Sequence, residues 1–138
     1  MMADEQTILV VDDERDVREL LALVLQSAGY AVIIAAHSRE VLDILATRQV
    51  ALLITDYHMP EMNGTELIAR VRAAHPRLPM ILASGERSLE ALAASCGANG
   101  YYEKGMPLTH LLTLVAAMLQ ESVRHNGDES DDRGRHEK

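Results

Sequence analysis

Five side chains that could do chemistry together follow short apolar runs of the sequence. They are Asp12, Asp13, Asp56, Ser84 and Lys104. Two adjacent aspartates after an apolar run repel each other, and a hard cation would remove this repulsion. Mg²⁺ fits this role because it prefers carboxylates, waters and phosphate oxygens as ligands. A carboxylate can also act as a nucleophile and form an aspartyl phosphate. A metal ion, an ammonium group and a hydroxyl group would then neutralise and bind the phosphoryl oxygens.

Each of these residues on its own has an ordinary structural explanation. An aspartate after a strand is usually a turn or helix-cap residue. A Ser-Gly pair such as Ser84-Gly85 is usually a turn, and a single lysine near a helix start is usually a solvated charge. The interpretation as a site therefore depends on the whole set, because complementary groups follow four different apolar runs.

The elements that must position these groups can be read from the hydrophobic pattern. Short apolar runs predict strands over residues 8–11, 30–35, 50–55, 79–83 and 100–103. Between them, helical spacing predicts helices over residues 17–25, 38–45, 64–71, 88–96 and 107–119, with Ser38 as a candidate cap. Alternating strands and helices indicate an α/β fold with a parallel sheet covered by helices on both faces. In such a sheet, ligands bind outside the carboxyl ends of the strands, where the five polar groups are expected.

Composition limits the classes of function. The 138 residues predict one domain, and 13 basic against 21 acidic residues give a net charge of −8. This charge disfavours direct binding to nucleic acid or to anionic membranes. The single cysteine, Cys96, suits a reducing compartment. Neither an apolar run of about 20 residues nor an apolar signal core is present in the sequence, so we expect a cytoplasmic protein.

The composition changes near residue 123. Residues 123–138 contain a single apolar side chain, Val123, among nine charged ones. Such a segment buries too little surface to offset the entropy lost on ordering. We therefore predict a domain over residues 1–122, followed by a disordered tail or the start of a linker over residues 123–138.

Four stretches of the sequence together resemble a known family. They read ILVVDDERDVRELL, LLITDYHMPEMNGTELI, ILASG and GANGYYEKGMP. Together with the predicted helix that follows the last stretch, they span residues 8–119. In this order they resemble the receiver domain of two-component response regulators. The resemblance implies a flavodoxin-like (βα)5 fold with strand order 2-1-3-4-5.

The resemblance also assigns roles in the metal and phosphoryl site. Asp56 matches the phosphoacceptor. Asp12 and Asp13 match the acidic pair that holds Mg²⁺, which the backbone carbonyl of His58 would complete. The His58 side chain is then expected to be exposed beside the site, although a phosphorylated or metal-binding histidine is the alternative. In the family, this position and that of Glu86 influence loss of the phosphoryl group.

A second group of positions matches the switch. Ser84 corresponds to the hydroxyl that moves toward the phosphoryl group, Lys104 to the lysine that pairs with it, and Tyr101 to the aromatic that turns inward. The family usually has Lys-Pro with a cis bond, whereas here Gly105 follows the lysine. We therefore expect a trans bond or a rearranged loop. Tyr102 stands where an aliphatic residue is more usual, which leaves open which tyrosine moves.

The resemblance implies a signalling protein and no enzyme beyond self-phosphorylation and self-dephosphorylation. A histidine kinase, a phosphotransfer protein or a small phosphodonor would phosphorylate Asp56. The face formed by the fourth helix, fifth strand and fifth helix would then bind a downstream protein in a two-component phosphorelay, with the chain as a monomer or a phosphorylation-dependent dimer. One alternative is a degenerate receiver that binds partners without phosphorylation. The other is a metal-dependent phosphatase with an Asp nucleophile, which the adjacent Asp12-Asp13 pair fits poorly because a D-x-D spacing is expected there.

Overall fold

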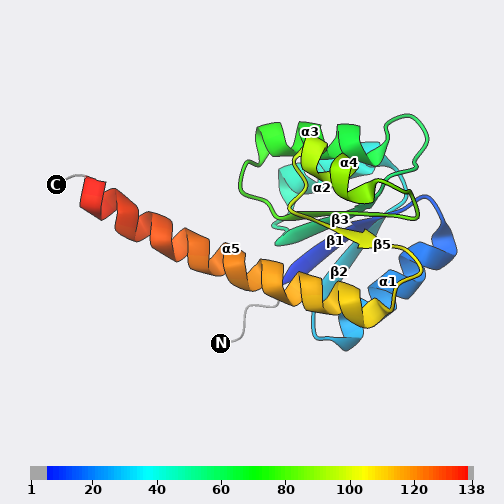
Figure 1. The fold of residues 1–138 in the computed structure, drawn as a ribbon, viewed down its shortest axis with the longest axis horizontal. Coiled ribbons are helices and arrows are strands. Elements are labelled where there is room, and N and C mark those ends of the chain that lie inside the picture. Colours follow the sequence, from blue (N-terminus) through cyan, green and yellow to red (C-terminus); the bar gives the residue numbers. More distant parts are fainter. Residues whose placement is uncertain (1–5, 137–138) are drawn as a thin grey trace.

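The computed structural model describes residues 6–136 of the chain, with side chains described as far as residue 122. Strands and helices alternate along this part of the chain (Figure 1). The elements are β1 (Thr7–Val11), α1 (Arg15–Ser27), β2 (Ala31–Ala35), α2 (Ser38–Thr47), β3 (Leu52–Asp56), α3 (Gly64–Ala74), β4 (Met80–Ser84), α4 (Leu89–Cys96), β5 (Gly100–Glu103) and α5 (Leu108–His136). Their order and type confirm the pattern predicted from the hydrophobic runs.

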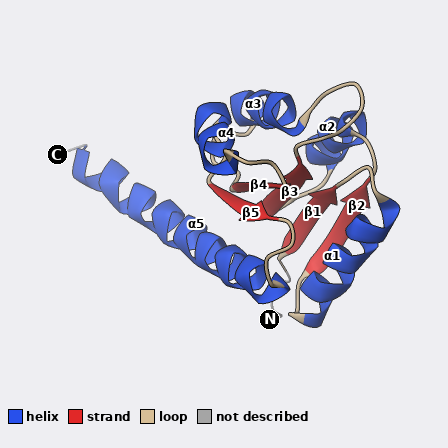
Figure 2. Ribbon diagram, turned by 45° about the vertical axis from the view of Figure 1, so that its right-hand side comes forward, coloured by secondary structure: helices blue, strands red, loops and turns tan. Residues whose placement is uncertain are grey.

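The strands form one sheet in the order β2-β1-β3-β4-β5, and every neighbouring pair is parallel. Helices α2, α3 and α4 lie over one face, whereas α1 and α5 lie over the other (Figures 1 and 2). This arrangement confirms the fold class and the strand order that the resemblance implied. It brings the carboxyl ends of all the strands to one edge of the sheet.

The burial of β1 shows why its apolar run is uninterrupted. Ile8 and Val10 belong to the apolar cluster on the side of α1 and α5, whereas Leu9 and Val11 belong to the cluster on the side of α2, α3 and α4. Alternate side chains of a strand point to opposite faces. A strand covered on both faces therefore needs an apolar residue at each position.

The start of α2 differs from the expectation for Ser38. The N-cap is His37, and Ser38 is the first helical residue. The capping box of α2 uses the Glu40 side chain, which accepts from the backbone amide of His37 at 3.0 Å. Ser38 is buried, and its hydroxyl donates instead to the backbone carbonyl of Met62 at 2.8 Å. This bond ties the loop between β3 and α3 to α2.

Helix α5 is longer than the sequence predicted. It extends past the sheet to His136, so it runs through most of the range expected to be a disordered tail (Figure 1). Residues 137–138 lie outside the described residues, and the domain boundary at residue 122 stays a prediction. Within the part of the chain that the structure describes, no helix is long and apolar enough to cross a membrane.

Candidate functional site

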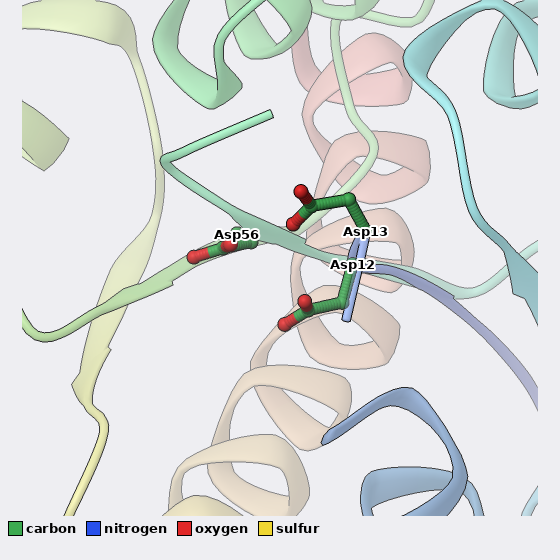
Figure 3. Close-up of side chains that lie close together, drawn as sticks. All are labelled: Asp12, Asp13 and Asp56. Carbon is green, nitrogen blue, oxygen red and sulfur yellow. The ribbon is translucent and has the colours of Figure 1, made fainter. Parts of the chain in front are cut away.

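Three aspartates meet at the carboxyl ends of two neighbouring strands (Figure 3). Asp12 and Asp13 follow β1, and Asp56 is the last residue of β3, which pairs with β1 in a register that places Val11 beside Thr55. One carboxylate oxygen from each aspartate lies within 4.8 Å of the others. Asp12 and Asp56 are buried, with 1% and 5% of their surface exposed, whereas Asp13 is exposed. The sheet therefore brings together the three carboxylates that the sequence indicated.

Lys104 reaches this cluster from the end of β5. Its Nζ lies 2.8 Å from Oδ2 of Asp12 and 3.1 Å from Oδ1 of Asp56. Burial raises the pKa of the Asp56 carboxyl, and the Asp12 charge adds to this increase, while Lys104 opposes it. Burial by itself would lower the pKa of Lys104, but the bonds to Asp12 and the charge of Asp56 raise it above the usual lysine value. The ammonium group therefore stays protonated between two buried carboxylates.

Ser84 lies on the strand next to Asp56. It is the last residue of β4 and is buried, one position beyond Ala83, which pairs with Asp56. Its Oγ accepts a hydrogen bond from the backbone amide of Glu86 at 3.2 Å. Its backbone carbonyl accepts from the Lys104 amide at 3.0 Å. Ser84 thus joins the loops that follow β4 and β5 at the edge where Asp56 lies.

The side chains of His58 and Glu86 are in hydrogen-bond contact beside the site. His58 belongs to the loop after β3 and Glu86 to the loop after β4, and the contact joins Nε2 of His58 to Oε2 of Glu86. The His58 side chain is 66% exposed, as the sequence predicted. The rings of Tyr57 and His58 pack edge to face, with their centres 4.7 Å apart. Both positions were named from the sequence, but their pairing was not foreseen.

The loop after β5 settles the question of the Lys104–Gly105 bond, which is trans. Gly105 has a φ of +101°. Glycine adopts such a positive φ readily because it has no Cβ, whereas other residues would be strained there. Tyr101 is 38% exposed, whereas Tyr102 is 6% exposed and its hydroxyl donates to the backbone carbonyl of Met106. The Tyr101 ring is therefore partly exposed in this structure, whereas that of Tyr102 is buried. The identity of the moving tyrosine stays a prediction.

Comparison with known proteins decides the family. Residues 8–116 match the response regulator receiver domain family. The chain belongs to this family. The resemblance stated from the four sequence stretches is thus confirmed.

Two curated relatives show where such receiver domains are found. The response regulator MprA of Mycolicibacterium vanbaalenii is 34% identical over 122 residues, which are 87% of this chain and 53% of MprA. The DNA-binding transcriptional regulator NtrC of Rhizobium meliloti is 34% identical over 128 residues, 91% of this chain and 26% of NtrC. The receiver chain therefore spans about half of one relative and about a quarter of the other.

Solved structures with the same fold include proteins of receiver length. A CheY-like receiver domain protein from Methanospirillum hungatei has a TM-score of 0.83 at 29% identity, covering 88% of this chain and 99% of that one. The response regulator TrrA of Thermotoga maritima, in complex with Mg²⁺ and BeF, has a TM-score of 0.77 at 30% identity, with coverage of 82% and 98%.

The donor set of this receiver fits a magnesium ion. Asp12, Asp13 and Asp56 offer three hard carboxylate oxygens close together, two from buried residues and one from an exposed residue. Mg²⁺ prefers such oxygen ligands and keeps several waters, so an open side at Asp13 suits it. A shallow hollow of about 390 Å³, lined in part by Asp13, Tyr57, His58 and Asn63, opens at this side.

Two supporting contacts escaped the sequence interpretation. The Arg18 guanidinium donates to the backbone carbonyl of Asp12 at 2.7 Å, from one turn into α1. The hydroxyl of the buried Tyr102 holds the loop after β5. The contact of Arg18 could have been suspected, because an arginine one turn into a helix can reach back to the end of the preceding strand. The contact of Tyr102 could not, because it depends on the path of the loop after β5.

Proposed function

We propose that this receiver accepts a phosphoryl group on Asp56 from the phosphohistidine of a kinase or a phosphotransfer protein, in the presence of Mg²⁺. The observation that supports this most is the position of the buried Asp56 carboxylate. It lies 3.1 Å from the Lys104 ammonium and in one cluster with Asp12 and Asp13. A nucleophile, a cation-binding pair and a fixed positive charge are thus combined at one strand edge.

The transfer assigns a task to each side chain. A carboxylate oxygen of Asp56 attacks phosphorus, the P–N bond to the donor imidazole breaks, and its electron pair stays on the ring nitrogen, which takes up a proton. Lys104 and the hydroxyl of Ser84 bind the phosphoryl oxygens, whose charge they offset. Mg²⁺, held by Asp12, Asp13, Asp56 and the His58 carbonyl, would supply the remaining positive charge. His58 and Glu86, which contact each other from the loops after β3 and β4, would limit the access of water to the acyl phosphate.

The signal would leave through a protein contact. The added charge on Asp56 biases Ser84 and Tyr101 toward a second arrangement and so changes the face formed by α4, β5 and α5. We propose a downstream protein as the target of this face, in the cytoplasm, with the receiver as a monomer or a phosphorylation-dependent dimer. The net charge of −8 argues against direct contact of this chain with nucleic acid. A phosphorelay intermediate that passes the group on fits the site equally well.

Acetyl phosphate provides a direct test of the phosphoacceptor. The protein is incubated with Mg²⁺ and acetyl phosphate and then weighed by mass spectrometry. We expect a single phosphoryl adduct, its loss when Mg²⁺ is chelated, and its absence in Asp56→Asn. An adduct that persists in Asp56→Asn would place the group on another residue. No adduct on the unaltered chain would instead favour a receiver that binds its partners without phosphorylation.

A further inference from the structure

The loop after β5 forms a tight turn around Gly105. The backbone amide of Met106 donates to the carbonyl of Glu103 at 3.1 Å, and the φ of Gly105 is +101°. These features match a type II turn with Lys104 and Gly105 at its centre, because such a turn needs a positive φ at its third residue. The turn therefore determines where the Lys104 side chain leaves the backbone.

Tyr102 holds the far end of this turn. Its ring is buried in the apolar cluster on the side of α1 and α5, and its hydroxyl donates to the carbonyl of Met106. The near end is held by β4, since the Lys104 amide donates to the Ser84 carbonyl at 3.0 Å. Burial raises the pKa of the Tyr102 hydroxyl, so this group stays a protonated donor. The turn is thus anchored on both sides of Lys104.

The space beneath the turn makes the Tyr102 anchor important. A hollow of about 270 Å³ lies between the turn and α1, lined by Val17, Leu20, Leu21 and Leu108 together with the turn itself. Side chains that fill a core hold a loop by close packing, whereas a hollow does not. A hydrogen bond from a rigid buried ring then has a large share in fixing the loop.

We propose that Tyr102 is a positioning residue, whose hydroxyl fixes the Lys104–Gly105 turn so that the Lys104 ammonium stays between Asp12 and Asp56. The proposal rests on the phosphoacceptor function in so far as Lys104 assists transfer. In this chain, a glycine turn held by a tyrosine hydroxyl takes the place of the usual Lys-Pro pair. The turn thus links the Tyr102 hydroxyl, which donates to Met106, to the ammonium that lies between Asp12 and Asp56.

The variant Tyr102→Phe tests this directly, because it removes the hydroxyl and keeps the ring. We expect the rate of phosphorylation by acetyl phosphate at saturating Mg²⁺ to fall about three- to tenfold, the range that one hydrogen bond accounts for. The affinity for Mg²⁺ should rise about twofold, because a loosened ammonium competes less for the carboxylates. A general loss of structure would lower both quantities, which would overturn the proposal, as would no change in either.

Chemical labelling of lysine gives a readout that needs neither metal nor phosphorylation. The chain has two lysines, Lys104 and Lys138, so acetylation of the first can be measured against the second by mass spectrometry. We expect Lys104 to react several times faster in Tyr102→Phe than in the unaltered protein. Tyr30→Phe is the matched control, since Tyr30 precedes β2 at the opposite edge of the sheet, and it should change none of the three quantities.

A second variant separates positioning from other effects. In a Lys104→Met background, Tyr102→Phe should leave the Mg²⁺ affinity unchanged, because the group that it positions is gone. An equal change in both backgrounds would refute the link to Lys104. If the unaltered chain takes up no phosphoryl group, the proposed function fails, and Mg²⁺ affinity and lysine labelling still decide the role of Tyr102. Unchanged labelling in that case would overturn it.

Discussion

At the scale of single residues, the negative charge on Asp56 lowers the stability of the folded protein. The site contains the carboxylates of Asp12, Asp13 and Asp56 against the ammonium of Lys104, and burial and the Asp12 charge raise the pKa of Asp56. A raised pKa means that the folded state binds the proton more tightly than the unfolded state does. Ionised Asp56 is therefore destabilising above its folded pKa, and this cost disappears as the pH falls below its unfolded pKa.

We expect Asp56→Asn to raise the free energy of unfolding of the metal-free protein at pH 7, because the amide removes a charge whose burial raises the pKa of Asp56. The gain should fall within about 0.5–2 kcal/mol, the usual range of stabilising substitutions. The difference between the variant and the unaltered protein should shrink as the pH is lowered toward 4. Urea unfolding in the presence of a chelator measures both values. Asp13→Asn is the control and should gain less, because Asp13 is exposed. A variant less stable than the unaltered protein at pH 7 would contradict this account.

At the scale of elements, the close approach of α3 to β3 sets the position of Asp56. A Cβ added to Gly64 would lie 2.2 Å from the backbone oxygen of Asp56, so α3 could not stay where it is. We expect Gly64→Ala to lower the free energy of unfolding by about 2–3 kcal/mol, as overpacking does. Urea unfolding measures this loss. Gly85→Ala is the control, since an added Cβ there has nothing within 4 Å, and equal losses in the two variants would show that the close approach is not the cause.

The elements also show what the sequence could predict and what it could not. Short apolar runs such as that of β1 made the strands and their burial on both faces predictable, because each residue must be apolar there. Parallel order then implied that Asp12, Asp13 and Asp56 would meet. The cap of α2 at His37 and the bond from Tyr102 to Met106 were not predictable, because they depend on the exact path of loops. Unlike strands and helices, such contacts leave no periodic pattern of residues in the sequence.

At the scale of the whole molecule, the apolar contacts of α5 with the sheet come early in the helix. Among the α5 side chains that the structure describes, which end at residue 122, the buried ones are those of Leu111, Val115, Met118 and Leu119. Residues 123–138 include a single apolar side chain, so their removal should cost the core little. We therefore expect the fold and the carboxylate cluster to be complete within residues 1–122.

A chain ending at residue 122 should therefore keep its stability to within about 0.5 kcal/mol, as surface changes usually do. It should also take up the phosphoryl group from acetyl phosphate at the same rate. A chain ending at residue 117 is the matched comparison, and it should lose about 3 kcal/mol or more because Met118 and Leu119 leave the core. Thermal unfolding followed by circular dichroism measures both chains. A large loss in the longer one would mean that the segment after residue 122 supports the fold.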